Sequence, residues 1–416
     1  MEWINAFLYI ALFIVLYRFN RNRFSIFISA IWGFSAFLGL FYVHSEVYRE
    51  GVYKTSLIPF LYLFLMFLIS IFPFIKEKDS IKNISFRSPK IIKHFCFFVA
   101  LISVFPFSEA IFRFAQSIAD GTILLIGANY DDYVAGREDA IIQFSQWGNR
   151  GITILQWLKV VTPILFIYYI QQNKYNKFVA IGLFMGASVP SLVNIAIGSK
   201  TELFFFILYF ISLYFYLKDT FDEKTSRVFK KLIKIMCCVT VAFVFVLSIG
   251  RYVIGNYYGS SNSTPYSFLF QYSSESMFNF NENAFHEKKH FGGTYTFFSA
   301  CKDLGLTNID YQDRRSYFSA KMKGSPSLFY TYIGELVLDY GLIGATFVAS
   351  IISILFSYIK RTKIITFDRL LLIGLYIYII ANSIFYFCFK LGFYPIYTTI
   401  ICSIIFRVIN VKKIKT

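Results

Sequence analysis

Long runs of apolar residues recur along the whole chain, and they limit what it can fold into more than any other feature. A helix needs about 20 apolar residues to cross the roughly 30 Å of hydrocarbon in a bilayer. Runs near that length predict spans at 3–17, 24–43, 56–75, 94–115, 151–170, 178–197, 203–217, 235–250, 328–358, 370–389 and 393–409. A soluble domain could not cover this much apolar surface, since 56% of the residues are hydrophobic and 16% are charged. The sequence therefore predicts an all-α, polytopic integral membrane protein with about 11 transmembrane helices, within a range of about 10–12.

The net charge of +17 is distributed as expected for a membrane protein. Most of the 41 Lys and Arg residues lie between or after the predicted spans, at 18–23, 76–93, 174–177, 218–234, 360–369 and 407–415. Short cytoplasmic loops are enriched in these residues, so the N-terminus is predicted to lie outside. The run at 3–17 has neither a basic start nor a small-residue cleavage site, which favours a retained span. The basic charge thus indicates orientation in a bilayer and no nucleic-acid partner.

Two outer segments are long, whereas the inner loops are short. Residues 1-250 are predicted to hold transmembrane helices 1–8 with a medium outer loop at 116-150, and residues 328-416 to hold the last three spans and a cytoplasmic tail. Between them, residues 251-327 are predicted to form a large extracytoplasmic loop. Amphipathic pieces at 266–280, 294–304 and 317–322 predict short helices at the membrane surface. A bundle of spans with only a structural role would not need this loop, which indicates a substrate on the outer face.

Charged residues at the outer ends of spans are candidates for function, because charge is costly at membrane depth. Lys200, in a tight turn before Glu202, is predicted either to hold an anionic diphosphate or to form an interfacial pair with Glu202. Arg251, directly after the eighth predicted span, is predicted either to bind phosphate oxygens or to anchor the helix at lipid headgroups. Glu335 and Asp339 are four residues apart, so both carboxylates share one helix face. They are predicted to act as general base and cation partner, or alternatively to neutralise Arg251 or Lys200 structurally.

The segment 286–290, HEKKH, matches a zinc-protease motif literally. On a helix its two histidines would share one face beside Glu287. Lysines occupy both middle positions, the following Phe-Gly-Gly would end a helix at once, and no third ligand is evident. The six cysteines show neither zinc-ribbon spacing nor a disulfide framework. A metal site is therefore not predicted, and His286 or His290 remains a candidate proton carrier.

Three short motifs give the chain a resemblance to a known family. They are Gly198-Ser199-Lys200 before a Phe-rich span, FGGTY at 291–295 in the large loop, and a loop-to-span entry that runs from Pro326-Ser327 through Gly334-Glu335 to DYGLIG at 339–344. With the span number and the large late loop, these motifs resemble the Wzy-type O-antigen and capsular polysaccharide repeat-unit polymerases of bacterial inner membranes (the oligosaccharide repeat unit polymerase family). Lys200 stands where the family pattern usually has arginine, so a bidentate contact is not expected there.

The resemblance implies a GT-C-like membrane glycosyltransferase of the bacterial cytoplasmic (inner) membrane. Such an enzyme joins repeat units carried on undecaprenyl diphosphate, as donor and acceptor, into O-antigen or capsular polysaccharide at the outer face. The implied transfer is inverting and metal-independent, and it uses no cofactor. Besides the lipid-linked glycans and the bilayer, the implied partners are a chain-length regulator and a flippase.

The resemblance also assigns expected roles to residues, because cations must hold the leaving diphosphate and a base must take the acceptor proton. Glu335 is the expected base, followed by Asp339 and then His286. The expected substrate-binding residues are Arg251, Lys200, Arg137, Arg150, Arg314, Arg315 and Tyr295, with Tyr311 as a further residue for stacking on sugars. Two other functions stay open. An O-antigen ligase shares the architecture and carries a large-loop histidine, whereas a lipid-linked oligosaccharide flippase or other transporter would have evenly short loops and an internal repeat.

Overall fold

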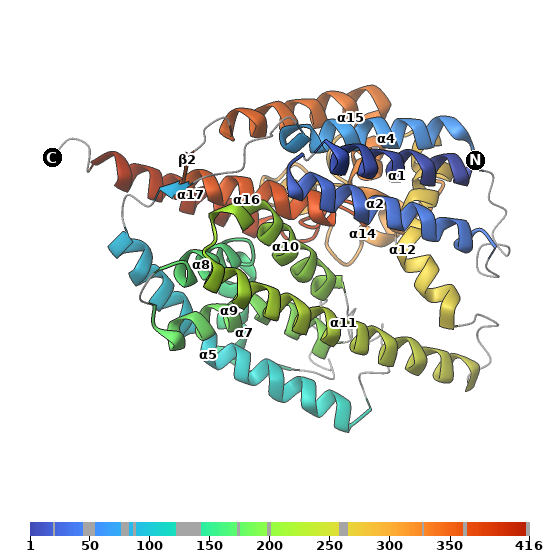
Figure 1. Ribbon diagram of the computed structural model, residues 1–416. Helices are drawn as coiled ribbons and strands as arrows, with labels where there is room; N and C mark the ends of the chain where they lie inside the picture. Colours follow the sequence, from blue (N-terminus) through green and yellow to red (C-terminus); the bar gives the residue numbers. More distant parts are fainter. Residues whose placement is uncertain are drawn as a thin grey trace. The chain divides into compact units, whose positions relative to one another are not determined.

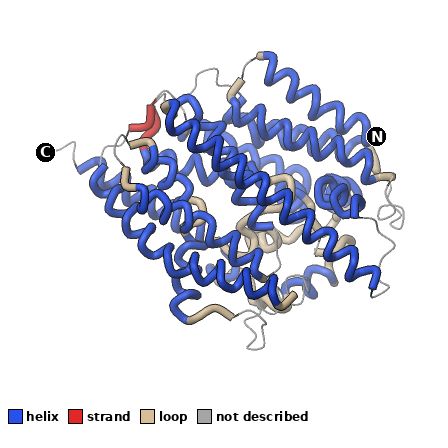
Figure 2. Tube along the Cα trace, turned by 60° about the horizontal axis from the view of Figure 1, so that its bottom comes forward, coloured by secondary structure: helices blue, strands red, loops and turns tan. Residues whose placement is uncertain are grey.

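A computed structural model describes residues 1–19, 21–44, 55–75, 83–85, 89–121, 143–172, 175–197, 201–257, 265–326, 328–360 and 364–412. Of these residues, 79% are helical, and Figures 1 and 2 show helices almost throughout. This bears out the all-α class of the sequence prediction. By its internal contacts the chain divides into two compact units: the first holds 1–80, 248–361 and 379–393, and the second holds 81–247, 362–378 and 394–416.

The first unit combines the N-terminal helices with the large loop and the helix that follows it. Its helices are α1 (Glu2–Arg18), α2 (Arg23–Tyr42), α4 (Leu57–Ile75), α12 (Pro265–Glu282), η3 (Ala284–His286), α13 (Phe298–Asp303), α14 (Arg314–Ser319) and α15 (Thr331–Ile359). α1 packs on α2, α12 on α2, and α15 on α4 (Figure 1). The rings of Tyr9, Trp32 and Phe67 fill the space between the first three helices, with centroids 4.6–5.4 Å apart. Of the three amphipathic pieces predicted in the large loop, 266–280 coincides with α12, whereas 294–304 and 317–322 only partly overlap the shorter helices α13 and α14.

The second unit is a bundle built around α9. Its helices are α5 (Pro89–Ala119), α7 (Gln146–Trp157), α8 (Val161–Ile170), α9 (Lys177–Ala196), α10 (Thr201–Leu217), η2 (Lys218–Thr220) and α17 (Tyr394–Lys412), and it shares α11 (Glu223–Tyr257) and α16 (Phe367–Asn382) with the first unit. Polar side chains cap the first turns of several of these helices, because the free N–H groups of a first turn need acceptors. The Asn176 side chain accepts from the Phe178 N–H at 2.9 Å, and Asp222 accepts from the Thr225 N–H at 2.9 Å.

Two short strands also belong to the second unit. β1 (Asn83–Ser85) and β2 (Ile364–Thr366) pair in parallel, with Asn83 opposite Ile364. They lie in segments that the sequence predicts to be inner loops, and the all-α prediction did not include them. Consecutive β-branched residues in β2 favour an extended backbone, which accounts for a strand at that place.

Six helices in the described part of the chain are long and apolar enough to cross a membrane, namely α2, α4, α5, α9, α10 and α15. The bent pair α7 and α8 makes a seventh if the two count as one span. Each of the eleven predicted spans overlaps helix in the structure, although α16 ends at Asn382, before the end of the predicted span 370–389. Several of these helices, such as α1 with 17 residues and α16 with 16, are short for a span. A membrane-embedded helical protein is thus supported, whereas the count of eleven spans is not confirmed.

The fifth predicted span, at 151–170, is wrong as a single helix. The structure has α7 and α8 there, bent by 79° at a break of three residues. Pro163 explains the break, since it has no N–H to donate and its ring would clash with the carbonyl four residues earlier, that of Lys159. The Tyr209 hydroxyl donates to the Val160 carbonyl at the break (3.0 Å), and Lys159 pairs with Glu202 at 3.1 Å.

Candidate functional site

The first part of α15 is enclosed by protein, whereas the rest has the surface of a membrane helix. Residues from Thr331 to Asp339 are buried, but Ile343 is 87% exposed and Phe347 is 66% exposed. The two parts meet at Gly341, whose backbone is not helical (φ 68°, ψ 179°). The part after Gly341 contains about 18 residues and reaches roughly 27 Å, close to the thickness of a hydrocarbon core. The enclosed part therefore lies at one end of a membrane-crossing helix, where buried charge is a mark of function.

A turn of the large loop docks on α15 at this break. The Phe291 N–H donates to the Leu338 carbonyl at 3.2 Å, and the Gly292 N–H donates to the Asp339 carbonyl at 2.9 Å. Glycine is required at Gly341, because its φ is positive and a Cβ there would lie 2.8 Å from the His290 ring. The FGGTY segment singled out in the sequence therefore packs directly against the start of the DYGLIG segment.

The Asp339 carboxylate secures the same turn. Its two oxygens accept the backbone N–H groups of Tyr295 and Thr296 at 2.9 and 2.7 Å, and the side chain is 1% exposed. A buried carboxylate that accepts two amide protons is well compensated for the loss of water. Asp339 therefore acts as the acceptor that fixes the loop on the helix.

Glu335, one helical turn before Asp339, forms a buried ion pair that the sequence analysis did not anticipate. Its Oε1 accepts from the Lys390 ammonium at 2.5 Å, and its Oε2 accepts from the Phe387 N–H at 2.9 Å. The side chains of Glu335 and Lys390 are 1% and 8% exposed. Lys390 lies in the connection between α16 and α17, so this pair ties the last inter-helix loop to the start of α15.

The ring of Tyr295 lies against two cations. The Lys390 ammonium is 3.4 Å from the ring centroid, and the Arg314 guanidinium carbon is 5.5 Å from it. The negative face of an aromatic ring attracts cations, and more strongly where water is excluded. Tyr295 is fully buried, with Phe318 packed edge-on at 4.9 Å. Its predicted stacking on a sugar stays a prediction, and such stacking would first require the ring to be uncovered. Glu335, Asp339, Lys390, Arg314 and Tyr295 are called the charged cluster below.

Arg314 is the least satisfied member of the charged cluster. Its guanidinium also lies over the rings of Phe298 and Phe318, at 5.3 and 5.6 Å. Its Nε and Nη2 atoms are buried and have no hydrogen-bond partner among the described residues. Leaving two such nitrogens unpaired is costly, because each has lost its hydrogen bonds to water and has gained no hydrogen bond in exchange. Both nitrogens could therefore donate hydrogen bonds to acceptor oxygens of a ligand.

The charge state of the charged cluster follows from its burial. Burial lowers the pKa of Lys390 to about 8, and Glu335 opposes that shift. Burial raises the pKa of the Tyr295 phenol well above its ordinary value, and the nearby Glu335 charge adds to the effect. Near neutral pH the site therefore contains a lysine that is still protonated, an arginine that is always charged and an uncharged tyrosine.

Of the other predicted site residues, none whose side chain the structure describes belongs to the charged cluster. Lys200, Arg137 and the side chain of Arg251 lie outside the described residues. Arg150 is exposed on α7 in the second unit, with its guanidinium 5.0 Å from the Trp147 ring centroid. Three more predicted site residues are exposed on the large loop. They are Arg315, next to Arg314 on α14, His286 in η3, and Tyr311, whose hydroxyl donates to Ser299 Oγ at 3.1 Å.

The HEKKH segment does not form the helix that a zinc-protease motif requires. His286 ends the short η3 helix, and the four residues after it have no regular structure. Glu287 instead accepts the backbone N–H groups of Lys288, Lys289 and Lys323, at 3.0, 3.1 and 2.9 Å. Among the described residues no group of three or more His, Cys, Asp or Glu side chains is arranged to hold a metal. Glu287 therefore stabilises the backbone of the large loop through these hydrogen bonds.

Lys390 is the functional candidate that sequence reasoning missed. A signal for it was present, because it is the one charged residue between the last two predicted spans and stands in an otherwise apolar stretch. Lys159 is a comparable case, since it is a charge in the middle of a predicted span. The rule that charge at membrane depth marks function applies to both.

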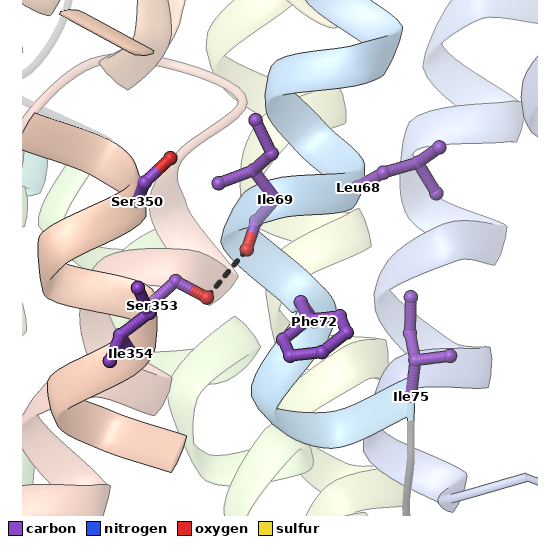
Figure 3. Close-up of a pocket in the computed structure, with 7 residues that line it drawn as sticks. All are labelled: Leu68, Ile69, Phe72, Ile75, Ser350, Ser353 and Ile354. Atoms are coloured by element: carbon purple, nitrogen blue, oxygen red, sulfur yellow. Dashed lines mark hydrogen bonds between the residues drawn. The ribbon is translucent and has the colours of Figure 1, made fainter. Parts of the chain in front are cut away.

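An apolar groove of about 440 Å³ lies elsewhere on the first unit, between α4 and α15 (Figure 3). It is lined by Leu68, Ile69, Phe72, Ile75, Ser350, Ser353 and Ile354. The Ser353 hydroxyl points to the Ile69 carbonyl and donates to it at 2.7 Å (Figure 3). Such bonds join helices in a membrane and leave no reactive group in the groove. The groove is suited to hydrocarbon and carries no chemistry.

Comparison of the chain with protein-family models, with curated proteins and with solved structures gave no match.

Proposed function

We propose that this chain is a membrane glycosyltransferase that joins oligosaccharide repeat units carried on undecaprenyl diphosphate, at the outer face of a bacterial cytoplasmic membrane. The observation that carries the proposal is Arg314, whose guanidinium has two buried nitrogens without a hydrogen-bond partner among the described residues and lies beside Lys390. Such a group suits the oxygens of a diphosphate, whose geometry matches the arginine fork. The sequence resemblance to repeat-unit polymerases supplies the reaction and the substrate class.

The proposed reaction is one displacement at the donor sugar. A hydroxyl of the acceptor repeat unit forms the new glycosidic bond while the bond between the donor sugar and its diphosphate breaks, so the configuration inverts. The hydroxyl proton passes to a base, and the electron pair of the broken bond leaves with the diphosphate. Arg314 and Lys390 would stabilise that developing charge in a site with little water. Glu335 is the proposed base, with Asp339 and His286 as alternatives.

A second candidate is an O-antigen ligase, which would transfer the finished glycan to another acceptor. The exposed His286 and His290 favour it to some extent, since a histidine in the large loop is the feature expected of that enzyme. Both functions would require the same cations, because both expel a lipid diphosphate.

The test is a polysaccharide gel from a host whose copy of this gene is deleted and then restored from a plasmid. With Arg314→Ala we expect about a 100-fold loss of polymer, the cost of one stabilising donor in a preorganised site. Arg314→Lys restores charge without the planar fork, so we expect partial recovery. Arg227→Ala, which removes an exposed arginine of α11, is the matched control, and immunoblots of membranes establish equal amounts of each variant.

Each possible gel result has a distinct meaning. Carrier capped with a single repeat unit supports the polymerase. Long chains that accumulate on the carrier indicate the ligase, and an absence of repeat units at the outer face indicates a flippase. A normal ladder in the deletion strain would show that the proposal is wrong.

A further inference from the structure

The ammonium of Lys390 contacts two side chains, and both contacts hold it close to Arg314. Its ammonium donates to Glu335 and lies on the Tyr295 ring, while the Arg314 guanidinium lies over the same ring, within 5.5 Å of its centroid. A lysine has a flexible stem and a compact charge, so its ammonium moves between neighbouring acceptors with little change elsewhere. An anion that paired with the free N–H groups of Arg314 would therefore arrive within reach of Lys390.

We infer that Lys390 is a shared cation, which Glu335 holds in the ligand-free chain and for which the phosphate oxygens of a bound ligand compete. The inference rests on the proposed function, because that function supplies a diphosphate as the ligand. Binding then draws Lys390 away from Glu335 and leaves the carboxylate with the Phe387 N–H as its remaining donor. Lys390 thus contacts the ligand, and Glu335 regulates that contact.

The exchange gives Glu335 a role that depends on the ligand. While Glu335 is paired with Lys390, its Oε1 is occupied and its charge is compensated. A carboxylate that loses its counter-ion in a region without water becomes a better proton acceptor. The base is therefore released when the donor diphosphate is in place, and it is masked when the site is empty.

Binding of undecaprenyl diphosphate to the purified full-length chain in detergent tests this competition through a double-mutant cycle. Glu335→Gln no longer competes for Lys390, so we expect about tenfold tighter binding, and Lys390→Met is expected to bind about tenfold more weakly. The gain from Glu335→Gln should disappear in the Lys390→Met background. Inorganic diphosphate, used as a second probe, separates headgroup binding from binding of the lipid tail.

The other outcomes of the cycle overturn the inference. Unchanged affinity in Glu335→Gln would mean that Glu335 does not compete for Lys390. An equal gain in both backgrounds would mean that Glu335 only repels the ligand. Weaker binding in both single variants would mean that the pair is merely structural. If Lys390→Met does not fold, Lys390→Gln replaces it in the cycle, because an amide can still donate to Glu335.

A matched control pair lies in the same loop. Lys302 and Asp310 are joined at 2.6 Å, and their side chains are 27% and 73% exposed. Lys302→Met and Asp310→Asn make the same charge changes outside the charged cluster, so we expect less than about a twofold change in affinity. The gel assay for polymer is independent of this measurement. Polymer formation without coupling would overturn the inference alone, and coupling without polymer would overturn the proposed function alone.

Discussion

A lysine that is almost wholly buried needs strong compensation, since removing an ammonium from water costs several kcal/mol. Lys390 obtains it from the Glu335 carboxylate and from the face of Tyr295. Replacing such a pair with apolar residues often leaves a protein as stable as before, so stability alone does not explain its presence. At the scale of single residues, the pair is therefore best explained by what Lys390 does when a ligand arrives.

The burial of Lys390 predicts a pH dependence of stability. We expect the free energy of unfolding to rise between pH 8 and 10.5 in the natural chain relative to Lys390→Met. The folded chain loses the Lys390 proton near pH 8, because burial lowers that pKa, whereas the unfolded chain keeps it to about 10.5. Over this window the unfolded state binds more protons, so stability increases with pH and the increment is lost as the pH falls through about 8.

Thermal unfolding in detergent across this pH range measures the difference between the two proteins. The groups that act on Lys390 are Glu335 and Asp339 of α15, Arg314 of α14 and, through its ring, Tyr295. All four are present in both proteins, although Lys390→Met removes the ion-pair partner of Glu335. Parallel pH profiles for the natural chain and Lys390→Met would contradict the prediction.

The sequence could identify four of the five residues of the charged cluster, all except Lys390. Glu335 and Asp339 were recognisable because a helix brings residues four apart onto one face, and both prove to be buried at the start of α15. The side chains of their predicted partners, Arg251 or Lys200, lie outside the described residues. Glu335 pairs with Lys390, which is 55 positions away, and Asp339 pairs with backbone amides of the loop. Spacing along one helix predicts neighbours on that helix, and it carries no information about a partner from another element.

At the scale of elements, the break in α15 at Gly341 matters most. It allows the loop turn to reach backbone carbonyls of the helix, and the carboxylate of Asp339 then fixes Tyr295 and Thr296. Tyr295 is the ring on which both cations lie. The geometry of the charged cluster therefore depends on one glycine in the middle of a helix.

Gly341→Ala is expected to destabilise the chain by about 1–3 kcal/mol, because an L side chain is strained at positive φ. The new Cβ would also crowd the His290 ring, at 2.8 Å. Gly305→Ala is the matched control, since Gly305 has the same φ of +68° with no atom within 4 Å of the added Cβ. Unfolding in detergent should show a larger loss for Gly341→Ala than for Gly305→Ala. Equal losses would mean that contact with His290 contributes nothing.

Helix positions were predictable from the sequence, and interruptions within them were not. Every apolar run that was predicted to be a span overlaps helix, because a backbone in lipid must satisfy its own hydrogen bonds. The break before Pro163 was missed because apolar residues continue on both sides of Lys159, the one charged residue of the predicted span. The break at Gly341 was missed for a different reason, since an isolated glycine is common in membrane helices.

At the scale of the whole molecule, the distribution of charge predicts the orientation in the membrane. The basic segment at 218–234 holds six Lys and Arg residues, which predicts the cytoplasmic side. The charged cluster combines the large loop, the start of α15 and the connection between α16 and α17, which the same rule predicts to lie outside. Repeat units carried on undecaprenyl diphosphate would be joined to one another on that face, so the proposed function requires this orientation.

Labelling with a charged, membrane-impermeant maleimide tests the orientation directly. In a cysteine-free version of the chain, Gln312→Cys places a thiol at an exposed position of the large loop, and Glu223→Cys places one where the natural side chain is 85% exposed. We expect Gln312→Cys to react in right-side-out vesicles and Glu223→Cys to react only in inside-out vesicles. Reaction of both on one face would exclude the predicted topology. Reversed labelling would place the charged cluster in the cytoplasm, where a polymerase of lipid-linked glycans could not use it.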